Sequence, residues 1–347
     1  MTTHEVYMQR CLQLAEQAAG YVAPNPMVGA VLVHQDLIIG EGYHMKYGES
    51  HAEVNCINNV PENQKHLIKE STLYVSLEPC NHFGKTPPCS DLIIKQQIPT
   101  VVIACTDPFE KVNGTGIEKL KAAGIQVITG ILEKEAIWLN RRFFTFHEKH
   151  RPYIILKWAQ SNNAKIAGAH FRPMKITNEI TDRIVHKWRS EEAAIMVGTN
   201  TALTDDPSLT TRLWPGQDAL RVLVDNNLKL PATLKLFDNK VPTIILNHLR
   251  QEEKEKNFFC RYAEHQSIPT ATTAVLYQRN INSLIVEGGA KLLGSFIAAG
   301  LWDEARVITN TKQQIENGID APVLKNAVLL KTKMIRTDEV SFYKKEV

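Results

Sequence analysis

The stretch that decides the fold begins with His51-Ala52-Glu53 and continues with Glu78-Pro79-Cys80 and then Pro88-Cys89. One imidazole and two thiolates are typical protein ligands of a catalytic zinc site, whose fourth position stays open to water. A nearby carboxylate can move protons to and from that water. The pattern therefore predicts a hydrolytic zinc site with His51, Cys80 and Cys89 as ligands and Glu53 as a catalytic residue.

The spacing of these residues constrains the local structure. Side chains two residues apart in mid-helix point to nearly opposite faces, so His51 and Glu53 converge only if His51 lies at or just before a helix N-terminus. A helix start would also favour the thiolate form of Cys80 and Cys89, and the preceding prolines suit that position. The simpler alternatives are an exposed pair of helix residues, unrelated thiols, or a structural zinc site with four protein ligands.

Zinc deaminases have the same parts in the same order, which makes hydrolytic deamination the predicted chemistry. Their signature ends in Cys-x-x-Cys, whereas eight residues, 81–88, separate Cys80 from Cys89 here.

Composition narrows the class of protein. A chain of 347 residues suggests two or three domains, and 44% hydrophobic with 22% charged residues is typical of a globular protein. The polar start and the lack of a long apolar run predict a cytoplasmic protein without a membrane span. A net charge of +3 gives little support to a nucleic-acid partner. Four cysteines have apolar neighbours and are expected to fill the core: Cys11, Cys56, Cys105 and Cys260.

Hydrophobic periodicity predicts two α/β layered domains with a boundary near Arg151-Pro152. In the first half, helices are expected at residues 6–19, 90–97 and 116–123, strands at 28–33, 72–77, 101–104 and 127–129, and a long amphipathic stretch at 133–150. In the second half, β-rich runs lie at residues 153–159, 193–197, 220–224, 241–246, 284–286 and 305–308. The charge-dense residues 251–256 are expected to form a solvated helix end or loop.

A resemblance to a known family rests on the segment between the two cysteines, which reads Cys80-Asn81-His82-Phe83-Gly84-Lys85-Thr86-Pro87-Pro88-Cys89. Together with Pro24-Asn25-Pro26, Val28-Gly29 and Gly42-Tyr43-His44, it closely resembles the deaminase half of the bifunctional deaminase and reductase family of riboflavin biosynthesis. The resemblance spans residues 1–150 and implies a cytidine-deaminase-like α/β/α layered domain. It also implies zinc-dependent deamination of 2,5-diamino-6-(5-phosphoribosylamino)pyrimidin-4(3H)-one, with Glu53 as proton shuttle. The residues implied to bind this substrate are Asn25, His44, His82 and Lys85.

The second half contains a strand that runs through adjacent glycines into an expected helix, residues 284–295. Backbone N–H groups exposed in such a turn can bind phosphate, although the pattern is not the Gly-x-Gly-x-x-Gly of a Rossmann fold. This segment and residues 197–212, with Asp205-Asp206-Pro207 and Arg212, resemble the reductase half of the same family. The resemblance implies a dihydrofolate-reductase-like α/β domain over residues 151–347, which uses NADPH to reduce the ribosyl group of 5-amino-6-(5-phosphoribosylamino)uracil to ribityl.

Matching positions imply a set of contacts in this reductase half. Those implied for NADPH are Ala159, Thr201, Gly289, Ala290, Lys291, Leu292, Leu293, Gly294 and Ser295. Those implied for the substrate are Asp205, Leu209, Arg212 and Glu287. Arg212 would form a fork around the phosphate, and Asp205 would orient or protonate the opened sugar imine. No basic residue is assigned to a 2′-phosphate, so the residues themselves do not separate NADPH from NADH.

The chain also departs from the reductase pattern. Ser161-Asn162-Asn163-Ala164 stands where the family has Ser-Leu-Asp-Gly, and Lys175 replaces a tryptophan two residues before Thr177. An active reductase with a reshaped pocket is favoured over a deaminase-only enzyme with a degenerate second domain. A nucleic-acid editing deaminase and a zinc-stabilised interaction protein are the alternatives from other classes. We expect a homo-oligomer that acts on a small phosphorylated pyrimidine.

Overall fold

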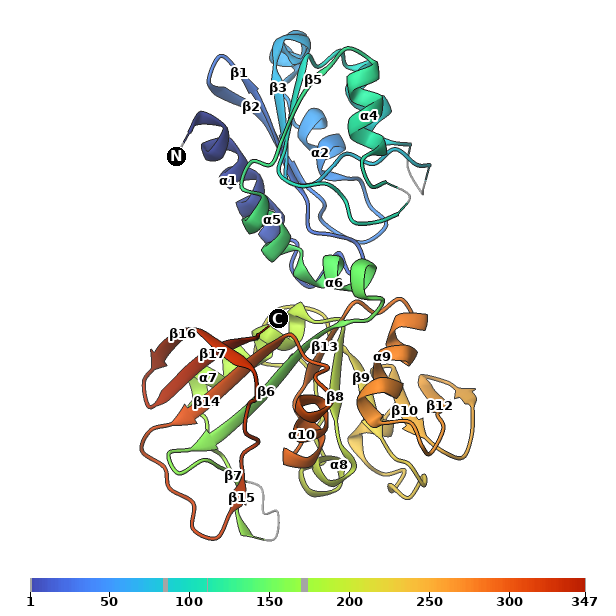
Figure 1. Cartoon of the computed structure of the whole chain (residues 1–347), viewed down its shortest axis with the longest axis vertical. Coiled ribbons are helices and arrows are strands. Elements are labelled where there is room, and N and C mark those ends of the chain that lie inside the picture. Colours follow the sequence, from blue (N-terminus) through green and yellow to red (C-terminus); the bar gives the residue numbers. More distant parts are fainter. Residues whose placement is uncertain (1, 84–86, 111, 170–173, 347) are drawn as a thin grey trace. The chain divides into compact units, whose positions relative to one another are not determined.

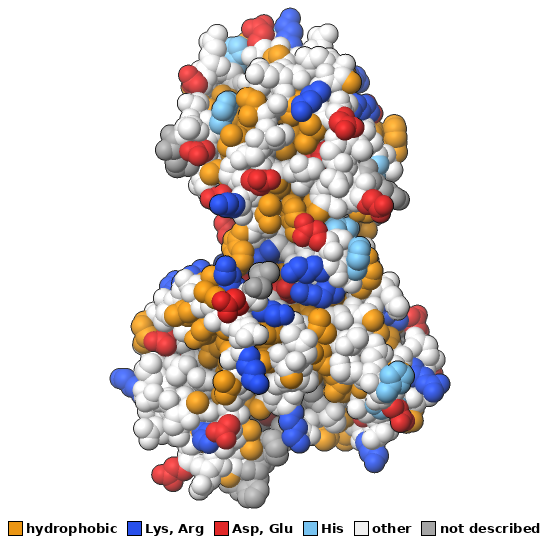
Figure 2. Space-filling model, in the orientation of Figure 1, with side chains coloured by type: hydrophobic (Ala, Val, Ile, Leu, Met, Phe, Trp, Pro, Cys, Tyr) orange, Lys and Arg blue, Asp and Glu red, His pale blue; other side chains and the backbone are white. Residues whose placement is uncertain are grey.

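The computed structural model describes residues 2–83, 87–110, 112–169 and 174–346. The chain forms two compact units, Met1–His150 and Arg151–Val347. Each unit is a sheet with helices packed on it (Figure 1). Acidic and basic side chains are interspersed on the face shown in Figure 2. Among the described residues, none of the helices combines the length and apolar character that a bilayer span requires.

The first unit is built on a five-stranded sheet in the order β2-β1-β3-β4-β5. β1 is antiparallel to β2 and β3, and β3, β4 and β5 run parallel. The strands are β1 (Gly29–His34), β2 (Leu37–Tyr43), β3 (Thr72–Val75), β4 (Thr100–Ile103) and β5 (Gln126–Thr129). The helices are α1 (Thr3–Glu16), α2 (Ala52–Asn58), α3 (Cys89–Lys95), α4 (Thr115–Ala122), α5 (Glu133–Leu139) and α6 (Arg141–Lys149), with a 3-10 helix at Glu62–Glu70.

Helices cover both faces of this sheet, which confirms the α/β/α layering. Strand β1 shows the reason, because alternate side chains point to opposite faces. Ala30 and Leu32 belong to the core that contains α2, α3 and α4 residues, and Val31 and Val33 belong to the core that contains α1, α5 and α6 residues. The four cysteines expected in the core are buried.

The expected amphipathic stretch at residues 133–150 forms two helices. Asn140 separates α5 from α6, and its side chain is 2% exposed. Its Oδ1 accepts the N–H of Met27 (2.8 Å), and its Nδ2 donates to the Met27 carbonyl (2.8 Å). These two bonds hold Asn140 against the segment that carries Asn25, and they account for the break in the helix.

Close packing of α2 against β2 depends on Gly42. A Cβ atom at Gly42 would lie 2.2 Å from the backbone nitrogen of Cys56 on α2. Only a residue without a side chain allows this approach. The N-terminus of α2, with His51 and Glu53, is thereby held against the sheet.

The second unit contains a ten-stranded sheet in the order β11-β12-β10-β9-β8-β13-β6-β14-β17-β16. The strands from β12 to β14 in this order run parallel, and β11, β16 and β17 are antiparallel to their neighbours. The strands are β6 (Tyr153–Ser161), β8 (Ala194–Val197), β9 (Leu220–Val224), β10 (Thr243–Asn247), β11 (Glu252–Lys254), β12 (Asn257–Arg261), β13 (Ser283–Val286), β14 (Glu304–Asn310), β16 (Ala327–Ile335) and β17 (Asp338–Lys345). A separate two-stranded sheet pairs β7 (Lys165–Ala167) with β15 (Ile319–Asp320).

Two hydrophobic cores flank this sheet. One contains residues of α9 (Ile268–Gln278) and α10 (Ala290–Ala298), and the other contains residues of α7 (Glu179–Glu191) and α8 (Thr199–Asp205). The β-rich runs expected in this half are confirmed as strands. The prediction of a helix end or loop at residues 251–256 is wrong for residues 252–254. These residues form the edge strand β11, and every side chain of that strand is exposed.

The carboxyl ends of the parallel strands β6, β8, β9 and β13 lie at one edge of the sheet, because parallel neighbours end at the same side. In open α/β sheets ligands bind at this edge. In this unit the turns that follow β8 and β13 lead into the N-termini of α8 and α10.

Candidate active sites

Three expected zinc ligands converge in the first unit. His51 is the N-cap residue of α2, the position that the His-x-Glu spacing requires. Its Nδ1 lies 3.6 Å from Cys80 Sγ and 3.4 Å from Cys89 Sγ, and the three ligand atoms are all within 4.8 Å of one another. Nitrogen and sulfur on neighbouring corners of a zinc tetrahedron are separated by about 3.5 Å, so the residues fit the metal.

The two cysteines reach this position differently. Cys89 is the first residue of α3, whereas Cys80 lies in the loop after β3 and does not begin a helix of its own. The N–H of Cys89 donates to Cys80 Sγ (3.3 Å), so one helix N-terminus serves both sulfurs. The hydrogen bonds from Cys89 and His51 lower the pKa of the Cys80 thiol to about 4, which favours a metal-binding thiolate.

Glu53 lies in the first turn of α2 beside these ligands and is 3% exposed. Burial, followed by the negative Cys80, raises the pKa of Glu53 to about 7. A carboxyl group with a pKa near neutrality can both accept and release a proton under physiological conditions.

Two expected substrate residues lie beside the zinc ligands. His44 Nδ1 is 3.0 Å from the Ser50 carbonyl, so this nitrogen carries the hydrogen and donates. His44 Nε2 then accepts from Asn25 Nδ2 (3.2 Å). The His44 and His51 rings meet edge to face with centroids 5.5 Å apart. Burial lowers the pKa of His44, which keeps the ring neutral.

The other two expected substrate residues are less well defined. His82 contacts Phe109, with ring centroids 5.9 Å apart, and its buried Nδ1 has no partner among the residues that the structure describes. Lys85 lies outside the described residues.

Sequence reasoning missed the role of Glu78, although it quoted the residue. The carboxylate is 3% exposed and accepts four backbone N–H groups. The donors and their distances are Asp107 (3.2 Å), Gly114 (2.9 Å), Gly116 (2.9 Å) and Ile117 (3.2 Å). Gly116 and Ile117 are in the first turn of α4, which has no capping side chain of its own. Glu78 therefore anchors the loop before α4 to the strand end that carries Cys80.

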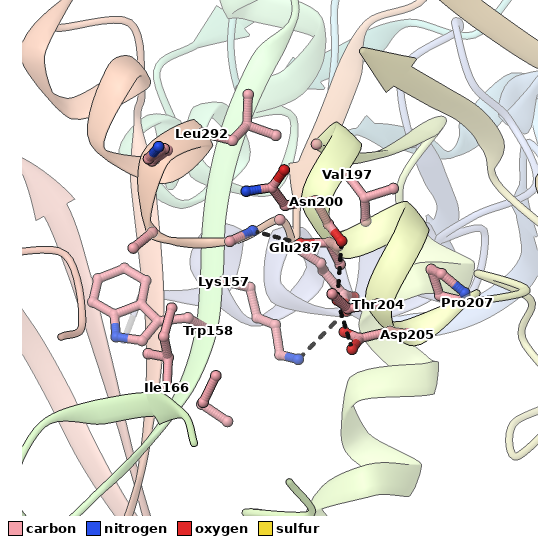
Figure 3. A pocket seen from close by; sticks show the side chains of 18 of the residues that line it. Lys157, Trp158, Ile166, Val197, Asn200, Thr204, Asp205, Pro207, Glu287 and Leu292 are labelled. Carbon is pink, nitrogen blue, oxygen red and sulfur yellow. Dashed lines mark hydrogen bonds and ion pairs between the residues drawn. The ribbon is translucent and has the colours of Figure 1, made fainter. Parts of the chain in front are cut away.

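A cavity of about 740 Å³ lies at the carboxyl edge of the sheet in the second unit (Figure 3). This volume is in the range of sites for small molecules and cofactors. Many of the expected residues line it: Ala159, Thr201, Asp205, Leu209, Glu287, Gly289, Ala290, Lys291, Leu292 and Ser295. Three do not: Leu293 is buried in the core, Gly294 lies further along α10, and Arg212 is exposed in the loop after β8 and α8.

Glu287 forms a buried ion network at the cavity wall. Its carboxylate receives two hydrogen bonds from Arg189 (2.9 and 2.8 Å) and a longer contact from Lys157 (3.4 Å). Burial alone would raise the pKa of Glu287, but Arg189 and Lys157 outweigh it and lower that pKa to about 2. Both cations line the cavity, and sequence reasoning assigned neither of them.

The glycine turn and Asp205 are held by threonines of α8. Gly289 N–H donates to Thr201 Oγ1 (3.0 Å), which connects the α10 turn to α8. Asp205 Oδ1 accepts from Thr204 Oγ1 (3.2 Å), and burial raises the pKa of Asp205. Dashed lines in Figure 3 mark hydrogen bonds and ion pairs between the residues drawn, and Thr204 and Asp205 are labelled there.

Comparisons with known proteins agree with this geometry. Residues 1–105 match the cytidine and deoxycytidylate deaminase zinc-binding region, and residues 152–312 match the RibD C-terminal domain. The riboflavin biosynthesis protein RibD of Aquifex aeolicus is 40% identical over 312 residues, which cover 88% of this chain and 86% of the relative.

Solved structures of similar proteins match this chain over 99% of its length. A diaminohydroxyphosphoribosylaminopyrimidine deaminase/5-amino-6-(5-phosphoribosylamino)uracil reductase from Thermotoga maritima has a TM-score of 0.90 and 32% identity, with 99% of each chain covered. RibD of Acinetobacter baumannii has a TM-score of 0.90 and 30% identity, with 99% of this chain and 98% of that chain covered.

The chain belongs to the RibD family. Members are bifunctional deaminases and reductases of riboflavin biosynthesis, with zinc and NADPH as cofactors.

Two of the departures from the RibD pattern, Asn163 and Ala164, lie in the turn between β6 and β7. Ala164 stands where the family has glycine and adopts φ 55°, the left-handed conformation that such a turn needs. Asn163 bonds to Ser161 Oγ (2.6 Å) and to the backbone of Ile315 in both directions (3.0 and 3.2 Å). Lys175 lines the cavity and pairs with Asp182 (3.5 Å). Asn163 and Ala164 therefore form a hydrogen-bonded turn after β6, and Lys175 places a cation at the cavity wall.

The Glu78 anchor yields a prediction for stability and metal binding. Each carboxylate oxygen of Glu78 accepts two backbone N–H groups. In Glu78→Gln one of these oxygens becomes an NH₂ group, so two N–H donors lose their acceptor. We expect the free energy of unfolding to fall by about 2 kcal/mol and the affinity for zinc to weaken. Urea denaturation and zinc titration measure both effects.

Glu62→Gln is the matched control, because the Glu62 side chain is 87% exposed and should tolerate the same change. Equal stability of the two variants would show that the four N–H contacts to Glu78 contribute nothing.

Proposed function

We propose that residues 1–150 deaminate 2,5-diamino-6-(5-phosphoribosylamino)pyrimidin-4(3H)-one. We further propose that residues 151–347 reduce the ribosyl group of 5-amino-6-(5-phosphoribosylamino)uracil to ribityl with NADPH. The observation that carries the first half is the convergence of His51, Cys80 and Cys89 beside the buried Glu53. The cavity at the carboxyl edge of the second sheet supports the other half. The named activities of the Thermotoga maritima relative support both.

The deaminase mechanism follows from the surroundings of Glu53. Zinc, when bound by His51, Cys80 and Cys89, supplies the Lewis acid that makes water nucleophilic at neutral pH. The Glu53 carboxylate takes one proton from the attacking water and delivers it to the ring nitrogen. It then takes the second proton from the added hydroxyl group and delivers it to the amine, which leaves as ammonia. Asn25 orients the pyrimidine ring by hydrogen bonds, and the neutral His44 positions the Asn25 side chain and lines the pocket with its ring. His82 and Lys85 complete this pocket, with Lys85 as partner of the substrate phosphate.

The reductase mechanism follows from the charges around the second cavity. NADPH, when bound along the glycine turn and the α10 N-terminus, supplies the hydride. Asp205 provides a proton to the opened sugar imine, and its burial supports this role because a raised pKa favours the protonated form. Glu287, kept ionised by Arg189 and Lys157, accepts hydrogen bonds from the substrate. Arg212 binds the substrate phosphate.

We also propose that the protein works in the cytoplasm as a homo-oligomer on small molecules, without a nucleic-acid partner. The four cysteines outside the zinc site are buried free thiols, which supports a reducing compartment. Edge strand β16 supports self-association, because Leu329 and Met334 are more than half exposed on it. Sedimentation equilibrium of the intact chain checks the assembly, and a monomer at micromolar concentration would contradict it.

Glu53→Gln separates the deaminase chemistry from metal binding. The amide cannot accept or release the proton, whereas the three ligands are unchanged. We expect normal zinc content, loss of ammonia release by about 100-fold or more, and unchanged NADPH oxidation when the deaminated intermediate is supplied. Mass spectrometry of the products gives the readout, and near-normal ammonia release would remove Glu53 from the mechanism.

Asp205→Asn is the reciprocal variant. We expect NADPH oxidation to fall by about 100-fold or more while the deaminase activity stays unchanged. Asp206→Asn is the neighbouring control, because Asp206 contacts Lys235 away from the cavity. If the wild-type protein itself failed to oxidise NADPH with the intermediate, the reductase proposal would be wrong.

A further inference from the structure

The wall of the second cavity carries more positive than negative side chains. Among the described residues that line the cavity, the charged ones are Lys157, Lys175, Arg189, Lys291, Asp205 and Glu287. A cavity with an excess of one sign of charge attracts ligands of the opposite sign. NADPH and a phosphoribosyl compound, the two ligands proposed above, are both anions.

Glu287 already binds two of these cations. The Lys157 and Arg189 side chains are 13% and 14% exposed, and both contact the Glu287 carboxylate. Taking a cation away from a buried carboxylate is costly, so we expect these contacts to persist when a ligand binds. In the described part of the cavity wall, Lys175 and Lys291 are the cations that remain for the phosphate groups of ligands.

Lys175 and Lys291 belong to opposite faces of the sheet. Side chains of α7 and α8 lie in one core, and side chains of α9 and α10 lie in the core on the other face. Lys291 is in the first turn of α10, directly after the glycine turn along which we place NADPH. Lys175 precedes α7 and contacts Asp182 of that helix.

The residues proposed to bind the substrate lie on the face of Lys175. Leu209 packs in the same core as the α7 and α8 side chains, and Asp205 is the last residue of α8. On α7, Arg189 follows Asp182 by two helical turns, so both side chains lie on one side of the helix. Lys175 is therefore held on the side of the cavity where we place the phosphoribosyl compound.

The ion pair of Lys175 is weak enough to be exchanged for a ligand. Its Nζ lies 3.5 Å from Asp182 Oδ2, and the lysine side chain is 67% exposed. Exposed ion pairs contribute little to stability. The other carboxylate oxygen, Oδ1, accepts a hydrogen bond from Thr177 Oγ1, so Asp182 keeps a partner if the lysine moves away. A phosphate monoester carries more negative charge than a carboxylate and is the stronger partner.

The backbone beside Lys175 is fixed to neighbouring elements. The Ile176 carbonyl accepts a hydrogen bond from Asn310 Nδ2 (2.7 Å), at the end of β14. Asn178, the N-cap residue of α7, donates its N–H to Asp338 Oδ2 (2.8 Å). Lys175 thus offers a flexible point charge on a rigid base at the cavity wall, which suits a phosphate group.

We propose that Lys175 is a further substrate-binding residue, whose ammonium group leaves Asp182 and binds the phosphate of the phosphoribosyl substrate. This inference rests on the proposed reduction of such a compound and adds a residue to that site. Lys175 contacts the phosphate and not the reacting carbon. It therefore acts on the affinity for the phosphorylated substrate rather than on hydride transfer.

The test compares Lys175→Met with Lys187→Met in the full-length, zinc-loaded enzyme. Methionine keeps an unbranched side chain and removes the charge. Lys187 is the matched control, because it pairs with Glu191 on α7 and is not among the described residues that line the cavity. For Lys175→Met we expect KM for the phosphorylated intermediate to rise about tenfold. The kcat and the Kd of NADPH, measured by its fluorescence, should stay close to the wild-type values, and the control should match the wild type throughout.

Two further comparisons separate a phosphate contact from a general disturbance. KM for the dephosphorylated intermediate should be the same in the wild type and in Lys175→Met. Lys175→Arg keeps the positive charge and should retain most of the affinity. An equal rise in KM for both substrates would overturn the proposal. Weaker binding of NADPH with an unchanged KM for the intermediate would also overturn it, because Lys175 would then serve the cofactor.

Isothermal titration calorimetry with ribose 5-phosphate provides a readout that does not need turnover. The first unit is also proposed to bind a phosphoribosyl compound, so the difference between the wild type and Lys175→Met reports the second unit. We expect the variant to bind ribose 5-phosphate about tenfold more weakly at one site, and identical titrations would overturn the proposal. If the wild type does not oxidise NADPH with the intermediate, the proposed reduction fails, and this titration still decides the role of Lys175.

Discussion

The convergence of one imidazole and two thiol groups is the constraint on which the first unit depends. His51 lies 29 residues before Cys80, and Cys89 follows Cys80 by nine residues. Each is placed by a helix N-terminus or by a backbone N–H at one. Gly42 lets α2 approach the sheet, and Glu78 ties the strand end before Cys80 to α4. Because a zinc tetrahedron tolerates little displacement, most of the local structure serves this geometry.

Much of the first site could be predicted because its signal is local. The His-x-Glu spacing requires a helix N-terminus, and the structure has one at His51. Hydrogen bonds between residues that are far apart in the sequence have no local sequence pattern that could predict them. The four donors to Glu78 belong to residues 107–117, and the break between α5 and α6 depends on Asn140 bonding to Met27, 113 residues away. Arg189 was missed for the same reason, because a lone arginine on a helix does not indicate a distant carboxylate.

In the second unit the candidate site is a cavity at the carboxyl edge of the parallel strands. Its glycine turn, Asp205 and Glu287 meet there because β8 and β13 are neighbours in the sheet although far apart in the chain. The departures at residues 163, 164 and 175 led us to expect a reductase with a reshaped pocket. Asn163 and Ala164 form a hydrogen-bonded turn, and Lys175 adds a positive charge to the cavity wall.

The central claim is that zinc binds through three protein ligands with one position left for water. X-ray absorption at the zinc edge of the purified, metal-loaded protein tests it most directly. The account predicts two sulfur neighbours at about 2.3 Å and two nitrogen or oxygen neighbours at about 2.0 Å, one of them exchangeable with solvent. A shell with three or four sulfurs, or the same spectrum from a variant in which Cys89 is replaced by serine, would contradict it.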